Sequence, residues 1–199
     1  DGGANLEAKP RYLLQFAHMG SLYVQSVLGW KHPKVALLNV GSEPEKGTAV
    51  LQDAYKLLNA SGLNFIGNIE SRDILSGVAD VVVTDGFSGN LILKFAEGLA
   101  TALLDMLKTE IKQSGLGVQL GAYLTRPAFQ NLKKRMNYEE YGGALLLGLN
   151  HPTVICHGSS RARAIFNAIR VAQESLSQNV TGKIADLMRE EPEGSRENK

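Results

Sequence analysis

The chain has 199 residues, 44% of them hydrophobic, so it can bury a substantial core and is expected to be globular. Its formal net charge of +1 provides no overall field for nucleic acid, and no basic patch with interleaved aromatic residues occurs, so nucleic-acid binding is not expected. Its single cysteine, Cys156, excludes an internal disulfide, and no Cys/His cluster has metal-ligand spacing, which favours a reducing cytoplasm without structural zinc.

The chain begins with a polar loop and a predicted helix. Residues 1–5 are typical of a loop that follows a strand, yet no strand precedes them, so we expect the chain to begin inside its fold. Pro10 suits the first turn of a helix, and the apolar spacing predicts that this helix continues to about Gly29. His18 lies within it, and a single histidine on a helix is more often a core or interface residue than a catalyst.

A strand, a turn and a helix come next, and the same order then begins again. Residues 34–40 form a continuous apolar run, which is typical of a strand buried on both faces of a parallel sheet. A polar turn at 41–47 ends this strand, and a helix is predicted from about 48 to 58. A short third strand at 63–66 and a short helix around 74–78 follow. The pattern predicts an α/β fold.

The rest of the chain is organised around the strand Val81–Val83. The polar, glycine-bearing turn Asp85–Asn90 ends this strand, and apolar residues then recur every three or four positions, so a helix is predicted to about Lys112. Such a turn presents free backbone N–H groups and the positive end of the helix dipole at the carboxyl end of a parallel strand. An anion, or an oxyanion formed in a reaction, would be well placed there.

The segment from about 112 to 137 differs from the rest. Residues 115–124 are glycine-rich and apolar, and Pro127 and the basic run 133–135 follow, which predicts a projecting turn and return helix. Such a hairpin suits either contact with a membrane surface or packing on a second copy of the chain, and both remain open. The residues expected to make this contact are Leu116, Leu120, Tyr123, Leu124 and Phe129.

The last predicted strand is Thr153–Cys156, which the polar residues 157–160 end. A helix is predicted from about Arg161 to Ala172. Residues 189–199 are nearly all charged or polar and are expected to form a disordered tail after a body spanning 1–188. The chain has no signal peptide and no apolar run long enough to cross a bilayer, so it is expected to be neither secreted nor integral to a membrane.

Three apolar strands thus end in polar glycine turns that open helices, at 41–47, 85–90 and 157–160. In a doubly wound parallel sheet such turns lie on one edge and can converge on one cleft. None of them is a phosphate-binding Walker loop, and no G-x-G-x-x-G follows a strand, so no nucleotide site is supported. A hydrolase triad of Ser88, His157 and Asp85 is not supported either, because the G-x-S-x-G elbow is missing.

Several segments, taken together and in order, carry a resemblance to a known family. The chain resembles PlsX, the bacterial phosphate acyltransferase family of phospholipid synthesis, over nearly its whole length. It corresponds to the C-terminal part of the longer family members, so site residues from the N-terminal part have no counterpart here. The segments that carry the resemblance are Gln15–Gly20, Asn39–Gly47, Thr84–Asn90, Tyr138–Gly143 and His157–Ser160.

This resemblance implies a three-layer αβα fold with a largely parallel sheet, like that of isocitrate dehydrogenase and phosphotransacetylase. It implies a homodimer that moves a fatty acyl group from acyl carrier protein to inorganic phosphate, without a cofactor or metal. The expected location is the cytoplasm, with peripheral attachment to the membrane, where a downstream glycerol-phosphate acyltransferase is a further partner. A coenzyme A-dependent phosphotransacetylase and a non-catalytic membrane scaffold are the alternatives.

The proposed chemistry gives the turn residues distinct roles. Phosphate is already an anionic nucleophile, so positioning and charge stabilisation can provide most of the rate. His157 is expected to donate to the thioester oxygen or to protonate the departing sulfur. Asp85 is expected to orient His157 or cap the following helix, because its carboxylate would repel phosphate, and Ser88 is expected to add a donor. The predicted substrate-binding residues are Gly86, Gly89, Asn90, Gly158, Ser159, Ser160, Asn5, Lys9, Asn39 and Glu43.

Basic side chains offer a surface for the acidic carrier protein. Lys133, Lys134 and Arg135, like Arg161 and Arg163, are candidates for this contact, although a run of charges is more often a solvated helix face. Simple helix capping is likewise the alternative to a chemical role for Asp85, Ser88 and Asn90.

Overall fold

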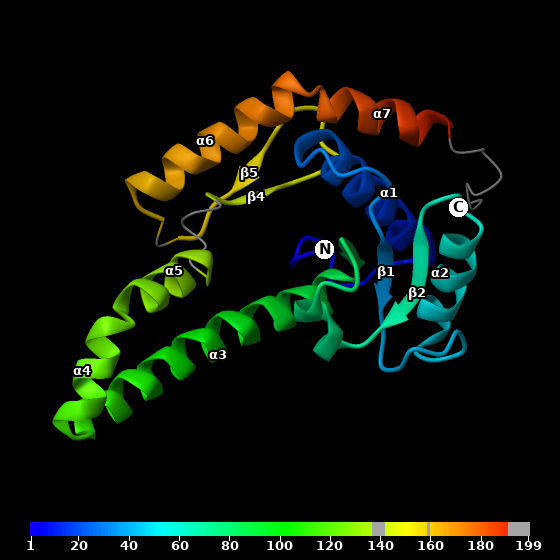
Figure 1. Ribbon diagram of the computed structural model, residues 1–199. Coiled ribbons are helices and arrows are strands. Elements are labelled where there is room, and N and C mark those ends of the chain that lie inside the picture. Colours follow the sequence, from blue (N-terminus) through cyan, green and yellow to red (C-terminus); the bar gives the residue numbers. More distant parts are fainter. Residues whose placement is uncertain (137–141, 159, 191–199) are drawn as a thin grey trace. The chain divides into compact units, whose positions relative to one another are not determined.

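The computed structural model describes residues 1–136, 142–158 and 160–190 (Figure 1). The other residues, and the side chains of 133–136 and 190, lie outside this description. The chain forms two compact units. The first comprises Asp1–Asn90, Leu145–Thr153 and the chain from Ala172 onward, and the second comprises Leu91–Ala144 and Val154–Val171.

A parallel sheet forms the centre of the first unit. Strand β1 (Val35–Leu38) lies between β2 (Phe65–Ile69) and β3 (Val81–Val83), in the order β2-β1-β3 (Figure 1). Both pairings are parallel, and Leu37 lies opposite Val83. The carboxyl ends of the strands therefore share one edge of the sheet, which we call the carboxyl edge.

Helices cover this sheet and complete the core. Helix α1 (Pro10–Val27) packs on α2 (Ala49–Asn59), on β3 and on α7 (Val180–Glu190). All of β1 is buried, which confirms the prediction of a strand buried on both faces. A 3-10 helix at Ser71–Ser76 takes the place of the short helix predicted around 74–78. The core cluster consists of Leu13, Ala17, Val35, Leu37, Ala54, Leu58 and Val83.

The second unit is mostly helical. Helix α3 begins in the first unit and spans Gly86–Gln113, and α4 (Leu116–Leu124) and α5 (Arg126–Met136) follow it. In the segment predicted to form a projecting turn and return helix, the glycine-rich half is helix α4 rather than a turn. The projection of this segment stays a prediction. Leu116, Leu120 and Leu124 recur every four residues, which favours a helix despite the intervening glycines.

The last predicted strand does not join the parallel sheet. Strand β5 (Val154–Ile155) pairs instead with β4 (Ala144–Leu145) in a separate two-stranded sheet, and Ile155 is 55% exposed. The prediction that this run forms a further buried strand of the parallel sheet was wrong, because a short apolar run does not by itself specify its partner. Helix α6 (Ala162–Ser177) then follows, close to its predicted start.

Two further boundaries differ from the sequence expectation. Helix α3 begins at Gly86 rather than after Asn90, because Asp85 caps it, as described below. Helix α7 was not predicted, and it includes residues 189 and 190 of the expected tail. The remainder of that tail lies outside the described residues.

Candidate functional site at the carboxyl edge

Asp85 lies at the end of β3 and caps α3. Its carboxylate accepts the backbone N–H of Ser88 at 2.7 Å and the Ser88 hydroxyl at 2.9 Å. The backbone carbonyl of Asp85 also accepts the N–H of Gly89 at 3.0 Å. This is the capping role considered for Asp85, and a carboxylate at a helix N-terminus is stabilised by the helix dipole.

These contacts change what the turn can offer an anion. The N–H groups of Ser88 and Gly89 already have acceptors, and the Ser88 hydroxyl donates its proton to Asp85. A hydroxyl has one proton, so Ser88 can offer a further ligand only its lone pairs in this conformation. The donors of Ser88 and Gly89 are therefore occupied, whereas the Asn90 side chain is exposed. We call residues 85–89 the Asp85 corner.

The loop at residues 1–5 lies against this corner. The Asp1 carboxylate accepts the backbone N–H groups of Gly3, Ala4 and Asn5 at 2.7–2.8 Å and the Asn5 side-chain amide at 2.8 Å. The Asn5 carbonyl in turn accepts the N–H of Gly86 at 2.8 Å. Asn5 thus holds the start of α3, and its amide is already bonded rather than open to phosphate.

The close packing of this loop explains the glycines of α3. A side chain at position 86 would meet the backbone of Asn5, and one at position 89 would collide with the carbonyl oxygen of Asp1. Asn90 lies beside Gly3 at the same place, although its side chain is exposed.

A second element of the carboxyl edge is the loop at residues 40–47, between β1 and α2. Three side-chain carboxamides hold its backbone carbonyls: Asn39 donates to Lys46 at 3.0 Å, Asn68 to Glu43 at 2.7 Å, and Gln52 to Glu45 at 2.7 Å. Asn39 and Asn68 are only 8% and 6% exposed. We call these three residues the carboxamide clamp.

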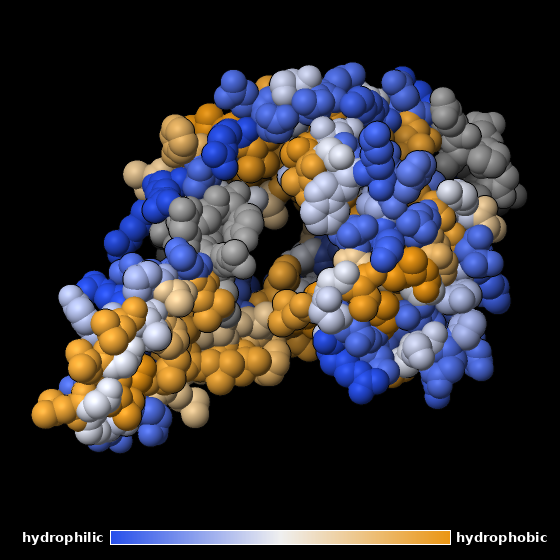
Figure 2. Space-filling view, viewed as in Figure 1, coloured by the Kyte–Doolittle hydropathy of each residue, from blue (hydrophilic) through white to orange (hydrophobic). Residues whose placement is uncertain are grey.

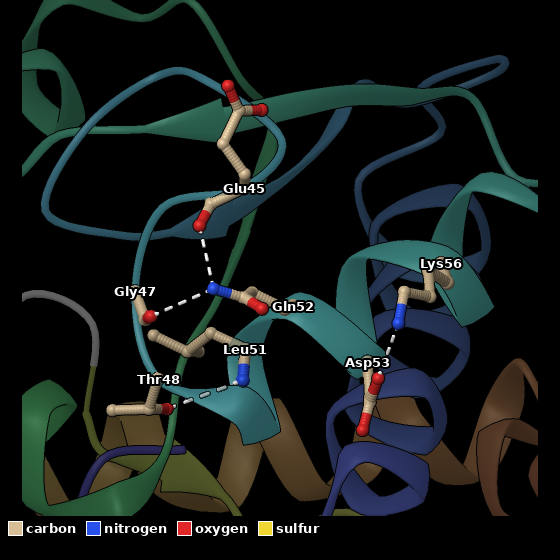
Figure 3. A network of polar contacts seen from close by, with 7 residues as sticks. All are labelled: Glu45, Gly47, Thr48, Leu51, Gln52, Asp53 and Lys56. Atoms are coloured by element: carbon tan, nitrogen blue, oxygen red, sulfur yellow. Dashed lines mark hydrogen bonds and ion pairs between the residues drawn. The ribbon is translucent and has the colours of Figure 1, made fainter.

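Figure 3 shows the α2 side of the clamp, where Gln52 reaches back to the loop. Its amide also donates to the Gly47 carbonyl at 3.3 Å, and Thr48 caps α2 by accepting the N–H of Leu51. Gly47 has a φ of +87°, and a side chain there would also collide with the Asn39 amide oxygen. Only glycine fits this position, so the loop has one well-defined path.

We call residues 40–47 the clamped loop. Two predicted substrate-binding residues therefore lie close together, because Asn39 is part of the clamp and Glu43 lies in the loop that the clamp holds. Since Leu37 lies opposite Val83, Asn39 and Asp85 both follow the β1/β3 ladder by two residues. The clamped loop and the Asp85 corner are therefore neighbours on the carboxyl edge. Asn68 and Gln52 were not predicted from the sequence, although an amide near the carboxyl end of a strand is a signal that points to Asn68.

Another group of predicted site residues, His157 to Ser160, follows strand β5. The N–H of Ser160 donates to the His157 carbonyl at 2.9 Å, and the Ser160 hydroxyl is buried without a partner among the described residues. Gly158 is exposed, and Ser159 lies outside the description. These residues belong to the second unit, so their convergence with Ser88 stays a prediction.

Lys9 precedes α1, where its carbonyl accepts the N–H of Tyr12 at 2.9 Å. Within the described part of the chain, no group of histidine, cysteine, aspartate and glutamate residues is arranged to hold a metal ion.

Comparison with known proteins identifies the family of this chain. It matches the sequence profile of the family described as fatty acid synthesis protein over residues 1–183. A phosphate acyltransferase of Heliobacterium modesticaldum is 54% identical over 186 residues, covering 94% of this chain and 55% of the relative. Those of Syntrophotalea carbinolica and a Geobacillus species are 52% and 50% identical, over 97% and 94% of this chain.

The chain spans about half the length of the curated relatives it matches, namely 55–57% of these three. The matches cover the Asp85 corner and the clamped loop together. They confirm the resemblance found in the sequence: this chain belongs to the fatty acid synthesis protein family, that of the PlsX phosphate acyltransferases.

Proposed function

We propose that the full-length protein transfers a fatty acyl group from acyl carrier protein to inorganic phosphate, giving acyl phosphate for phospholipid synthesis. The observation that carries this proposal is the similarity to phosphate acyltransferases of about 50% identity, across the carboxyl edge and the rest of the chain. The fold of the whole protein is then that of isocitrate dehydrogenase and phosphotransacetylase, of which the parallel sheet is one part.

In the proposed reaction a phosphate oxygen attacks the thioester carbonyl carbon. The C–S bond then breaks, and the pantetheine sulfur leaves as a thiol after taking up a proton. No enzyme nucleophile is required, so the protein contributes orientation and charge stabilisation. His157 is proposed to donate to the thioester oxygen or to the departing sulfur, with the backbone N–H groups of 158 and 159 and the Ser160 hydroxyl at the developing oxyanion.

Asp85 acts in this proposal as a positioning residue. Its cap fixes the first turn of α3, and the Asn5 carbonyl fixes the same turn from the other side. Gly86 and Gly89 permit this close packing, and Asn90 and Lys9 are the exposed polar residues proposed to contact substrate nearby.

The test is the reaction itself. Full-length protein incubated with long-chain acyl carrier protein and phosphate is expected to yield acyl phosphate and free carrier thiol in equal amounts. Formation of neither product would exclude the proposal. Replacing the carrier protein by coenzyme A distinguishes a phosphotransacetylase, because such an enzyme would use acyl-coenzyme A in preference.

A second proposal concerns the apolar surface of α4. Leu116 is 85% exposed, and Leu120, Tyr123 and Leu124 are also exposed, whereas Phe129 of α5 is half-buried. Figure 2 shows apolar residues gathered over α3 and α4. None of the helices in the described part of the chain is both long enough and apolar enough to cross a bilayer.

We infer that this surface contacts the membrane, a second copy of the chain, or both, as is expected of a cytoplasmic homodimer working beside a glycerol-phosphate acyltransferase. Replacing Leu120 and Leu124 by aspartate is expected to abolish vesicle binding or to separate the dimer, as measured by flotation and light scattering. A scaffold without catalysis would bind vesicles even after replacement of Asp85 and His157.

A further inference from the structure

Two adjacent glycines, Gly142 and Gly143, precede strand β4 in the second unit. They contact the two elements that flank the predicted site residues 157–160. Strand β5 ends at Ile155 and helix α6 begins at Ala162, so residues 156–161 connect these two elements. We call residues 156–161 the β5–α6 connection.

Gly143 lies against the end of β5. A Cβ added at position 143 would lie 2.6 Å from the carbonyl oxygen of Ile155, 2.8 Å from Val154 Cγ1 and 3.3 Å from Cys156 Sγ. A carbon atom does not approach a carbonyl oxygen this closely, so a side chain here would displace the backbone of β5. Because His157 follows Ile155 by two residues, this displacement would reach the β5–α6 connection.

Gly142 lies against α6. It is buried, and a Cβ added there would collide with the backbone nitrogen of Ala168 and the carbonyl carbon of Asn167. Both of these residues are buried in turn. Gly142 also has a φ of +82°, which disfavours any residue with a side chain. The backbone of α6 is therefore packed directly on the backbone at position 142.

The two contacts together fix the spacing across the β5–α6 connection. Adjacent Cα atoms are about 3.8 Å apart, so one dipeptide holds both the end of β5 and the second turn of α6. The glycines contribute only backbone atoms, and they have no side-chain rotamer that could absorb a shift. Both ends of the connection are thus held by a segment that lies outside it.

The connection carries a polar group that the described residues leave without a partner. The Ser160 hydroxyl is buried and unbonded among them, while the Ser160 N–H donates to the His157 carbonyl at 2.9 Å. A buried hydroxyl without a partner costs free energy, which a substrate oxygen would restore. In the proposed reaction these residues act on the thioester, where a misplacement of about 1 Å can lower the rate about a hundredfold.

We propose that Gly142 and Gly143 are positioning residues of the proposed acyl transfer. They set the distance between β5 and α6 and thereby place His157 and the Ser160 hydroxyl at the thioester. They act through the β5–α6 connection rather than by contact with substrate. This inference rests on the proposed function for its kinetic test, whereas a second test of the packing is independent of catalysis.

The kinetic test uses Gly143→Ala in the full-length protein. The added methyl group displaces the end of β5, so kcat for acyl phosphate formation is expected to fall at least tenfold. The KM values for acyl carrier protein and for phosphate are expected to stay within threefold of wild type, because the variant disturbs the groups that act on the reacting atoms.

Gly148→Ala is the matched control. Gly148 follows β4 and has a φ of +85°, so alanine is strained there, but the nearest atom to its added Cβ is Met19 Sδ at 3.4 Å. This variant is expected to lose stability in thermal unfolding and to keep the kcat of wild type. The comparison separates loss of stability from displacement of the β5–α6 connection.

Cys156 provides the test that is independent of catalysis, because it is the single cysteine of this chain and its sulfur lies beside Gly143. The rate of its alkylation by N-ethylmaleimide is followed by mass spectrometry of the peptide that contains it. Gly143→Ala is expected to raise this rate at least fivefold by displacing the thiol, and Gly148→Ala is expected to leave it unchanged. This response in a protein that forms no acyl phosphate would reject the function and keep the packing role of the glycines.

The double variant Gly143→Ala/Val154→Ala gives the result if the single variant does not fold. Removing Val154 Cγ1 gives the new methyl group room, so the double variant is expected to regain part of kcat and part of the wild-type alkylation rate. The inference is overturned if Gly143→Ala keeps either kcat or the Cys156 alkylation rate within twofold of wild type, or if Gly148→Ala lowers kcat as much.

Discussion

The Asp85 carboxylate accepts both the backbone N–H and the hydroxyl of Ser88, at 2.7 and 2.9 Å. Because of this double contact, the Ser88 hydroxyl donates its proton to Asp85, and Asp85 caps the N-terminus of α3. In the sequence, Asp85 and Ser88 suggest a catalytic pair, but in the structure they form the N-terminal cap of α3. This cap fixes the position of the first turn of α3 at the carboxyl edge.

Asp85→Ala is expected to lower the free energy of unfolding by about 1–2 kcal/mol, because α3 loses its cap. Ser88→Ala removes only the hydroxyl contact and is expected to lower it by about 0.5–1.5 kcal/mol. Chemical denaturation of both variants and of the double variant measures their coupling. Strictly additive losses would mean that the hydroxyl contact contributes nothing.

Gly89→Ala is expected to destabilise the protein by several kcal/mol or to prevent folding, because the new methyl group would collide with the Asp1 carbonyl. Gly98→Ala on the same helix is the matched control, since nothing lies within 4 Å of its added Cβ. The control is expected to raise the free energy of unfolding by about 0.5–1 kcal/mol through helix propensity. Equal effects at both positions would contradict the packing of loop 1–5 on α3.

Ser175 on α6 is 1% exposed, and its hydroxyl has no partner among the described residues. Ser175→Ala is therefore expected to leave stability unchanged or to raise it by up to about 1 kcal/mol, because an unsatisfied buried hydroxyl is removed. Ser21 on α1 is also buried but accepts the Gln25 side chain at 3.2 Å, so Ser21→Ala is expected to destabilise. Thermal unfolding measures the stability of the two variants. A clear loss of stability in Ser175→Ala would indicate that the Ser175 hydroxyl is hydrogen-bonded.

Burial raises the pKa of the Tyr23 phenol above its ordinary value of 10.0. The unfolded chain then loses this proton first as the pH rises, so the contribution of Tyr23 is constant below pH 10 and is lost from there up to the folded pKa. Urea denaturation from pH 9 to 11 is expected to show a steeper loss of stability for wild type than for Tyr23→Phe. Parallel curves for the two proteins would show that Tyr23 ionises as in solvent.

Periodicity and turn chemistry predicted the first unit well. Residues 34–40 contain strand β1, and α2 and α3 end within one residue of the predicted ends, because helices and buried parallel strands have strong local patterns. The start of α3 was placed too late, because its first turn is polar. The short run 153–156 was assigned to the wrong sheet, because its partner, the equally short β4, has no signal of its own.

The sequence predicts where the candidate site lies but not the contacts that its residues make. Strand ends locate the carboxyl edge, yet the sequence alone does not tell a capping carboxylate from a catalytic one, and Asp85 shows the difference only through its bonds to Ser88. Asn68 and Gln52 were missed because they act on a loop distant in sequence, through carbonyls that any residue supplies.

The loop that carries Lys46 is anchored by neutral amide groups alone, none of which gains or loses a proton between mildly acidic and mildly alkaline conditions. The conformation of this loop is accordingly expected to stay the same over this pH range and at different salt concentrations. Any change of activity with pH or salt concentration can then be assigned to charged groups of the protein or its substrates, rather than to movement of this loop.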